Sequence, residues 1–222
     1  MGSGYLAGAY FFYRVLRASA WHTFGIAFLP ITVFATLMAV TTLLHLDRFH
    51  HGHVVFWAWA SVYALTPFLV PFVWWRNRAH APAPVPGEAR LDARVRWAFA
   101  MVGAAELVAV VAVFADPHLL IDVWPWTLSP LTARVMASWF ALTATLWILV
   151  ARDGRWGAIK IIIQASVIGL LLILVSTGRA WTDFDPSNPL RWAFVAGMAA
   201  LLVGFSALLT VMDRTRPSRG SA

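Results

Sequence analysis

The sequence contains no cysteine, only one lysine and few charged residues of either sign. Without cysteine, the chain cannot form disulfides, thiolate nucleophiles, thioether links to haem, or Cys-ligated iron–sulfur and zinc sites. Asp, Glu, Lys and Arg make up 12% of the 222 residues, whereas soluble domains carry roughly 25%. Hydrophobic residues make up 60%. A water-soluble core of this size cannot bury so much apolar surface, so the composition predicts a membrane protein.

Long runs without any charged residue are the main pattern in the chain. A helix crosses a hydrocarbon core about 30 Å thick with about 20 apolar residues. Five runs fit this requirement without interruption: residues 23–44, 54–75, 135–151, 161–178 and 192–212. A sixth run, residues 97–115, is interrupted only by Glu106. These runs predict an all-α transmembrane bundle.

The N-terminal apolar run, residues 1–13, is shorter than the others. By length alone it is a truncated span, an interfacial helix or a signal-peptide core. Arg14 and Arg17 follow the run instead of preceding it, which disfavours a signal peptide. Counted as the first span, it brings the predicted number to about seven.

The basic residues are distributed unequally between alternate connections. With residues 1–13 as the first span, thirteen of the 17 basic residues lie on one side, and the other side holds only Arg48, Arg134, Arg179 and Arg191. Because basic residues concentrate on the cytoplasmic side, we expect the N-terminus outside and the C-terminus inside. The strong excess of Arg over Lys indicates the coding bias of a GC-rich bacterium. The expected location is therefore the bacterial cytoplasmic (inner) membrane.

An ungapped shift of 135 residues aligns the chain with itself. Its most informative pairs are Arg17 with Arg152, Trp21 with Trp156, Phe49 with Phe184 and Trp57 with Trp192. The shift predicts three helices, one intervening helix and three further helices, as a parallel repeat about an axis along the membrane normal. The predicted units are a first repeat (residues 1–75), a basic Pro/Ala-rich cytoplasmic linker (76–96), an intervening span with an outer Trp-Pro-Trp segment (97–134), a second repeat (135–212) and a basic cytoplasmic tail (213–222).

This 3+1+3 layout resembles the topology of SWEET-type sugar transporters. Prolines shape both halves of that family, whereas here they occur only in the first half, at Pro30, Pro67 and Pro71. The segments YLAGAYFFY (residues 5–13), DRFHHGH (47–53) and WPWTLSPLTAR (124–134) resemble multi-pass membrane proteins of GC-rich bacteria, a family with no assigned activity. The second resemblance implies a further helix before Met1, so a 4+4 layout stands beside 3+1+3.

Glu106 is the sharpest candidate for a functional site. A carboxylate near mid-membrane costs at least about 2.5 to 3.5 kcal/mol on insertion scales, so it usually faces protein or water. Gly103 beside it permits close helix approach. Glu106 is a candidate to bind a proton, a cation or a cationic substrate group, with Gln164 as a further candidate binding residue. The alternative is a protonated packing residue with no function of its own.

The outer loops contain a second candidate, a divalent-metal site. Imidazole and carboxylate ligands are offered by Asp47, His50, His51 and His53, and by Asp183 and Asp185 in the corresponding loop of the second repeat. Solvated loops tolerate the same residues without a metal. Haem with two axial histidines is disfavoured because His22 and His45 lie at opposite ends of one predicted helix. No cofactor is expected.

Three functions follow as alternatives. The leading one is a small transporter or channel-like carrier without enzymatic activity, in which Glu106 binds the coupling ion or substrate. The second is an accessory or scaffold subunit of a larger membrane complex, and the third is an outer-face metal-dependent enzyme. Expected partners are the lipid bilayer, anionic headgroups at the cytoplasmic face and either a second copy or a membrane complex. Nucleic acid is not expected, because the basic residues form short clusters between spans.

Overall fold

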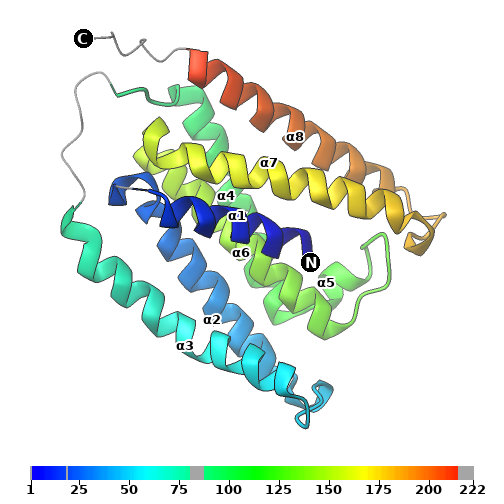
Figure 1. Ribbon diagram of the computed structural model, residues 1–222. Coiled ribbons are helices and arrows are strands. Elements are labelled where there is room, and N and C mark those ends of the chain that lie inside the picture. Colours follow the sequence, from blue (N-terminus) through cyan, green and yellow to red (C-terminus); the bar gives the residue numbers. More distant parts are fainter. Residues whose placement is uncertain (1, 19, 81–87, 215–222) are drawn as a thin grey trace.

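The computed structural model describes residues 2–18, 20–80 and 88–214 (Figure 1). In chain order the elements are α1 (Gly2–Leu16), the 3₁₀ turns η1 (Trp21–Thr23) and η2 (Gly25–Ala27), α2 (Phe28–Leu44), η3 (Leu46–Arg48), α3 (Val54–Asn77), η4 (Arg78–His80), α4 (Ala93–Ala115), α5 (His118–Ile121), α6 (Pro130–Asp153), α7 (Trp156–Arg179), η5 (Trp181–Asp183) and α8 (Leu190–Arg214). Within these residues the only β-type pairing is one isolated bridge between Arg90 and Arg155. The all-α prediction is confirmed.

Six helices of the described chain are long and apolar enough to cross a membrane. They are the continuous segment Gly25–Leu44 and the helices α3, α4, α6, α7 and α8. Each coincides with one of the six charge-poor runs, so those runs were correctly predicted to be helices. Helix α1 has 15 residues and is about 22 Å long at 1.5 Å per residue. It is therefore shorter than a hydrocarbon core of about 30 Å.

Helix α6 lies at the centre of one group of helices. It packs against α2 and α4, and α2 packs against α3 (Figure 1). Its buried face carries a column of alanines at helical spacing, all fully buried: Ala133, Ala137, Ala141 and Ala144. Small residues let neighbouring helices approach closely, which replaces the hydrophobic driving force that is missing between helices in lipid.

Helix α7 is the centre of a second group, in which it packs against α1 and α8. The turn between α6 and α7 joins the groups. Gly154 ends α6 with a φ of +69°, in the left-handed region that favours glycine. Directly after it, Trp156 is fully buried in an apolar cluster with Val150 and Ile163.

Residues 88–92 are hydrogen-bonded to this turn. The amide of Leu91 donates to the carbonyl of Gly154 (2.8 Å), and the amide of Trp156 donates to the carbonyl of Ala89 (2.9 Å). Arg96 adds a side-chain bond from Nε to the carbonyl of Ala151 (2.7 Å). Of the predicted linker, residues 76–80 belong to α3 and η4, residues 93–96 begin α4, and residues 81–87 lie outside the described residues. The end of the linker is therefore built into the fold.

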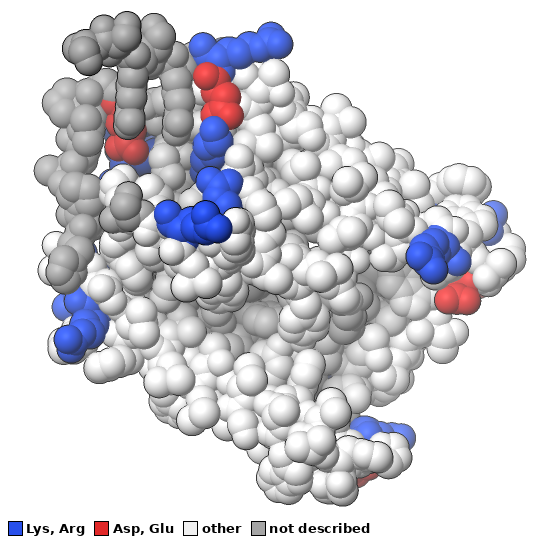
Figure 2. All heavy atoms as spheres, viewed as in Figure 1, with Lys and Arg blue, Asp and Glu red and all other residues white. Residues whose placement is uncertain are grey.

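The charged side chains gather at the ends of the helices. On the face drawn in Figure 2, Lys, Arg, Asp and Glu lie at the two ends of the bundle, and the surface between them shows none. The long helices expose large apolar residues within this band, such as Phe68 (76% exposed), Val108 (72%) and Val203 (68%). Water would hydrate this surface unfavourably, whereas lipid matches it. These features are those of an integral, multi-pass membrane protein.

The elements recur at a spacing of 135 residues. Helix α2 ends at Leu44 and α7 at Arg179, and each is followed by a 3₁₀ turn, Leu46–Arg48 in one case and Trp181–Asp183 in the other. The next helices, α3 and α8, pack back on α2 and α7 respectively. The contact of α1 with α7 has its counterpart in the contact of α6 with α2. Helix α4 lies between the two sets and packs on α6.

We predict that Gly103→Ala lowers the thermal unfolding temperature of the detergent-solubilised protein. A Cβ at Gly103 would lie 2.8 Å from the carbonyl oxygen of Ala144, so α4 would have to move away from α6. Such overpacking costs about 1–3 kcal/mol. Gly197→Ala in α8 is the matched control, because a Cβ there meets nothing within 4 Å. Equal unfolding temperatures for the two variants would contradict the close α4–α6 crossing.

Candidate functional site

Glu106 lies near the middle of α4, on the side that packs against α6. Its carboxylate oxygen Oε2 accepts a hydrogen bond of 2.9 Å from the hydroxyl of Thr143 in α6. The same hydroxyl lies 3.0 Å from the carbonyl oxygen of Phe140, its alternative acceptor. Glu106 is partly buried, and no described basic residue lies within 4 Å of its carboxylate. The site is thus an acid in the apolar zone, held by one hydroxyl.

The close approach of α4 and α6 positions this pair. Gly103, one turn before Glu106, brings the α4 backbone against the carbonyl of Ala144. Ala144 adjoins Thr143, so the glycine contact and the hydrogen bond belong to the same crossing of the two helices. The prediction that a small residue lets Glu106 face protein agrees with this arrangement.

Gln164 belongs to a different polar cluster, between α7 and α1. Its Oε1 accepts hydrogen bonds from Nη1 of Arg14 (2.8 Å) and from the hydroxyl of Tyr10 (3.2 Å). Arg14 Nη1 also donates to that hydroxyl (2.7 Å), so the three side chains form a closed triangle. Glu106 and Gln164 therefore have separate partners on separate helices. The sequence interpretation assigned Arg14 only to the basic cytoplasmic flank and missed this triangle, although Tyr10 and Arg14 are one helical turn apart.

An aromatic cluster joins α1 to the centre of the bundle. The hydroxyls of Tyr5 in α1 and Tyr63 in α3 lie 2.8 Å apart. The ring of Tyr5 meets the edge of Trp139 in α6 at a centroid distance of 5.3 Å. Gly4 lies against the same indole, where a Cβ would be only 2.7 Å from a ring atom. The cluster fixes α1 beside α6, and no motif in the sequence indicated it.

The predicted metal ligands lie on loops with other contacts. No group of three described His, Asp or Glu side chains lies close enough to hold a metal ion. Of the histidines, His50 and His53 are neighbours, with ring centroids 6.0 Å apart. His51 packs instead on the ring of Phe56. Asp47 pairs with the adjacent Arg48 (3.1 Å), and both side chains are exposed.

The loop that contains Asp183 and Asp185 packs against the Trp124-Pro125-Trp126 segment. The amide of Asp185 donates to the carbonyl of Pro125 (2.9 Å). Its carboxylate accepts bonds from Ser187, which hold the pKa of Asp185 below its ordinary value. Figure 1 shows the α2–α3 and α7–α8 connections at different corners of the bundle. A shared metal site thus stays a prediction that rests on the sequence alone.

His45 and Arg134 form a polar contact between the end of α2 and the beginning of α6. Nη1 of Arg134 lies 3.0 Å from Nε2 of His45, and Nε of Arg134 donates to the carbonyl of Phe114 at the end of α4 (3.1 Å). Burial, and then the positive charge of Arg134, hold the pKa of His45 below its ordinary value. A neutral His45 can accept the hydrogen bond from Arg134, whereas a protonated one cannot. Arg134 thereby connects the ends of three helices.

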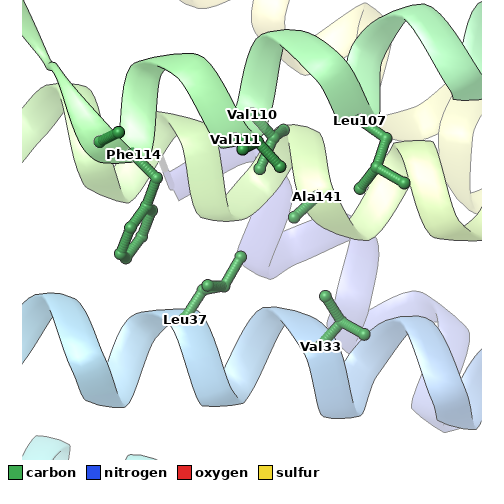
Figure 3. Close-up of a pocket in the computed structure, with 8 residues that line it drawn as sticks. Val33, Leu37, Leu107, Val110, Val111, Phe114 and Ala141 are labelled. Carbon is green, nitrogen blue, oxygen red and sulfur yellow. The ribbon is translucent and has the colours of Figure 1, made fainter.

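Two grooves lie on the surface of the described helices, and both are apolar. One, of about 430 Å³, lies between α2 and α4 above Ala141 of α6 (Figure 3). The other, of about 380 Å³, lies between α4 and α8 beside Phe99 and Phe205. No charged or hydroxyl-bearing side chain lines either groove.

Comparison with known protein families, with curated proteins and with solved structures finds no match.

We predict that the His45–Arg134 contact makes stability depend on pH. A histidine whose folded pKa is lowered contributes stability that is complete above its unfolded pKa, about 6.5, and is lost as the pH falls through the folded value. The unfolding temperature of the wild type should therefore fall more between pH 7.5 and pH 5 than that of His45→Gln, which retains an acceptor but does not titrate. His51→Gln, on an exposed part of the same loop, should behave like the wild type. The same pH dependence in His45→Gln as in the wild type would contradict this assignment.

Proposed function

We propose that this protein is a small membrane carrier without enzymatic activity, in which Glu106 binds a proton or a cation in the apolar zone. In the proposed topology, α1 is a short first span, the N-terminus lies outside and the C-terminus inside. The two three-helix sets α1–α3 and α6–α8 form a parallel repeat, with α4 as the intervening span.

Two features support this topology. Thirteen of the 17 basic residues fall on the side assigned to the cytoplasm. The helix ends and 3₁₀ turns recur at the same spacing of 135 residues that aligns the sequence with itself. The exchange of contacts, α1 with α7 and α6 with α2, is the pattern expected for two copies related by a two-fold axis.

The observation that carries the proposed function is the Glu106–Thr143 hydrogen bond. An ionised carboxylate in hydrocarbon is costly unless it is paired, and the described surroundings of Glu106 supply one hydroxyl and no basic side chain. A bound proton or cation would remove this cost. Loading and release would change the hydrogen bonding of Thr143 between Glu106 and the carbonyl of Phe140, at the point where α4 crosses α6 most closely. Acidic side chains in such positions mark ion and proton pathways.

A second candidate function is an accessory subunit of a membrane complex. The apolar surfaces of α3 and α8 support it, because their membrane windows are only 11% and 6% buried within the chain. These surfaces can pack against lipid or against another membrane protein. Purification in a gentle detergent distinguishes the two functions, since a stable stoichiometric partner favours the accessory subunit and a uniform homo-oligomer favours the carrier.

We predict that Glu106→Gln abolishes proton or monovalent-cation flux into proteoliposomes. Glutamine still accepts the bond from Thr143 but binds neither a proton nor a cation at this site, so the fold should persist while flux is lost. Flux is measured with an internal pH-sensitive dye and a panel of cation gradients. Glu88→Gln is the matched control, because Glu88 lies before α4 and is the only other glutamate.

Two results would contradict the carrier. One is flux through Glu106→Gln equal to that of the wild type, and the other is a wild type that moves none of the ions tested. Loss of flux in Glu88→Gln as well would show that the reconstitution, and not the site, is responsible.

A further inference from the structure

The groove between α2 and α4 is closed below and open on one side. Val33 and Leu37 of α2 form one wall, and Leu107 and Val111 of α4 lie on the other (Figure 3). The floor is Ala141 of α6, which is fully buried under these walls. From Leu107 to Ala115 the α4 wall extends about 12 Å along the helix axis. The groove therefore follows the long direction of the helices, as a lipid chain would.

A positive charge lies at the end of the groove where α2 and α4 finish. The groove ends at Phe114 and Ala115, and the carbonyl of Phe114 accepts a hydrogen bond from Nε of Arg134. The second contact of this guanidinium is His45. No acidic side chain among the described residues lies within 4 Å of Arg134. Its charge is therefore not neutralised by any described part of the chain.

We propose that this groove binds an anionic phospholipid, with an acyl chain between α2 and α4 and the phosphate at Arg134. The walls match the chain because they are entirely apolar, and the guanidinium matches the phosphate in charge and hydrogen-bonding geometry. Since the groove opens through the apolar band of the surface, the bilayer itself supplies the ligand. In the proposed orientation this lipid belongs to the outer leaflet. The site is separate from the Glu106 site and does not depend on its function.

The test is native mass spectrometry of the full chain released from detergent containing phosphatidylglycerol or phosphatidylcholine with the same acyl chains. The wild type should retain phosphatidylglycerol preferentially. Arg134→Gln should reduce this preference about fivefold, the effect of one basic group near the membrane surface. Arg48→Gln is the matched control, because Arg48 is exposed on the neighbouring loop and already pairs with Asp47. It should leave the preference unchanged.

A second pair of variants tests the groove itself. Val111→Trp places a large ring in the groove and should reduce retention of both lipids at least threefold. Val108→Trp is the control, because Val108 is a similarly exposed valine on α4 that does not line the groove. Equal loss in both variants would overturn the proposal, because it would show a general lipid coat and no specific site.

Two further measurements keep the test decisive if a variant folds poorly. Arg134→Lys retains the charge and should retain the preference for phosphatidylglycerol. In the wild type the preference should decrease as the salt concentration rises, because salt screens charge–charge attraction. An unchanged preference in folded Arg134→Gln overturns the headgroup assignment. A dimer that Val111→Trp converts to a monomer would assign the groove to a second copy of the chain instead.

Discussion

The fold depends on the requirement that backbone polar groups in hydrocarbon be satisfied within the chain. A helix meets it by itself, because each N–H bonds to a carbonyl four residues earlier. The structure accordingly places every charge-poor run in a helix, and irregular backbone lies between these helices. Once the helices are in lipid, apolar side chains such as Val203 can remain exposed. What remains to be specified is which helices touch and how closely.

Small residues and single polar contacts specify that packing. The alanine column of α6 and Gly103 of α4 allow the backbones to approach, and shape provides most of the specificity. Polar pairs then fix the positions: Glu106 with Thr143 between α4 and α6, and Gln164 with Arg14 between α7 and α1. The same close crossing that brings Glu106 to Thr143 forms the floor and wall of the lipid groove. The proposed ion site and the proposed lipid site therefore share helices without sharing residues.

Much of the fold could be predicted from sequence, because the signals are local. Charge-free length identified six helices, and Glu106 with Gly103 was identified as an acid facing protein because both residues lie on one helix. The partners of these residues could not be predicted, since helix contacts depend on rotation and depth. Gln164 was grouped with Glu106 on polarity alone, but rotation of α7 turns it towards Arg14. Likewise, the Tyr5–Tyr63 contact joins helices whose adjacency leaves no local pattern. The repeat, the number of spans and the orientation stay predictions.

The central claim is that the apolar band of this protein is embedded in lipid, and cysteine accessibility tests it most directly. The chain has no cysteine, so single substitutions need no background removal. Val203→Cys lies in the exposed band of α8, and Ser187→Cys lies in the exposed loop before it. In intact membranes, a water-soluble, membrane-impermeant maleimide should label Ser187→Cys from the outside and leave Val203→Cys unlabelled until detergent denaturation. Rapid labelling of Val203→Cys in intact membranes would contradict the account.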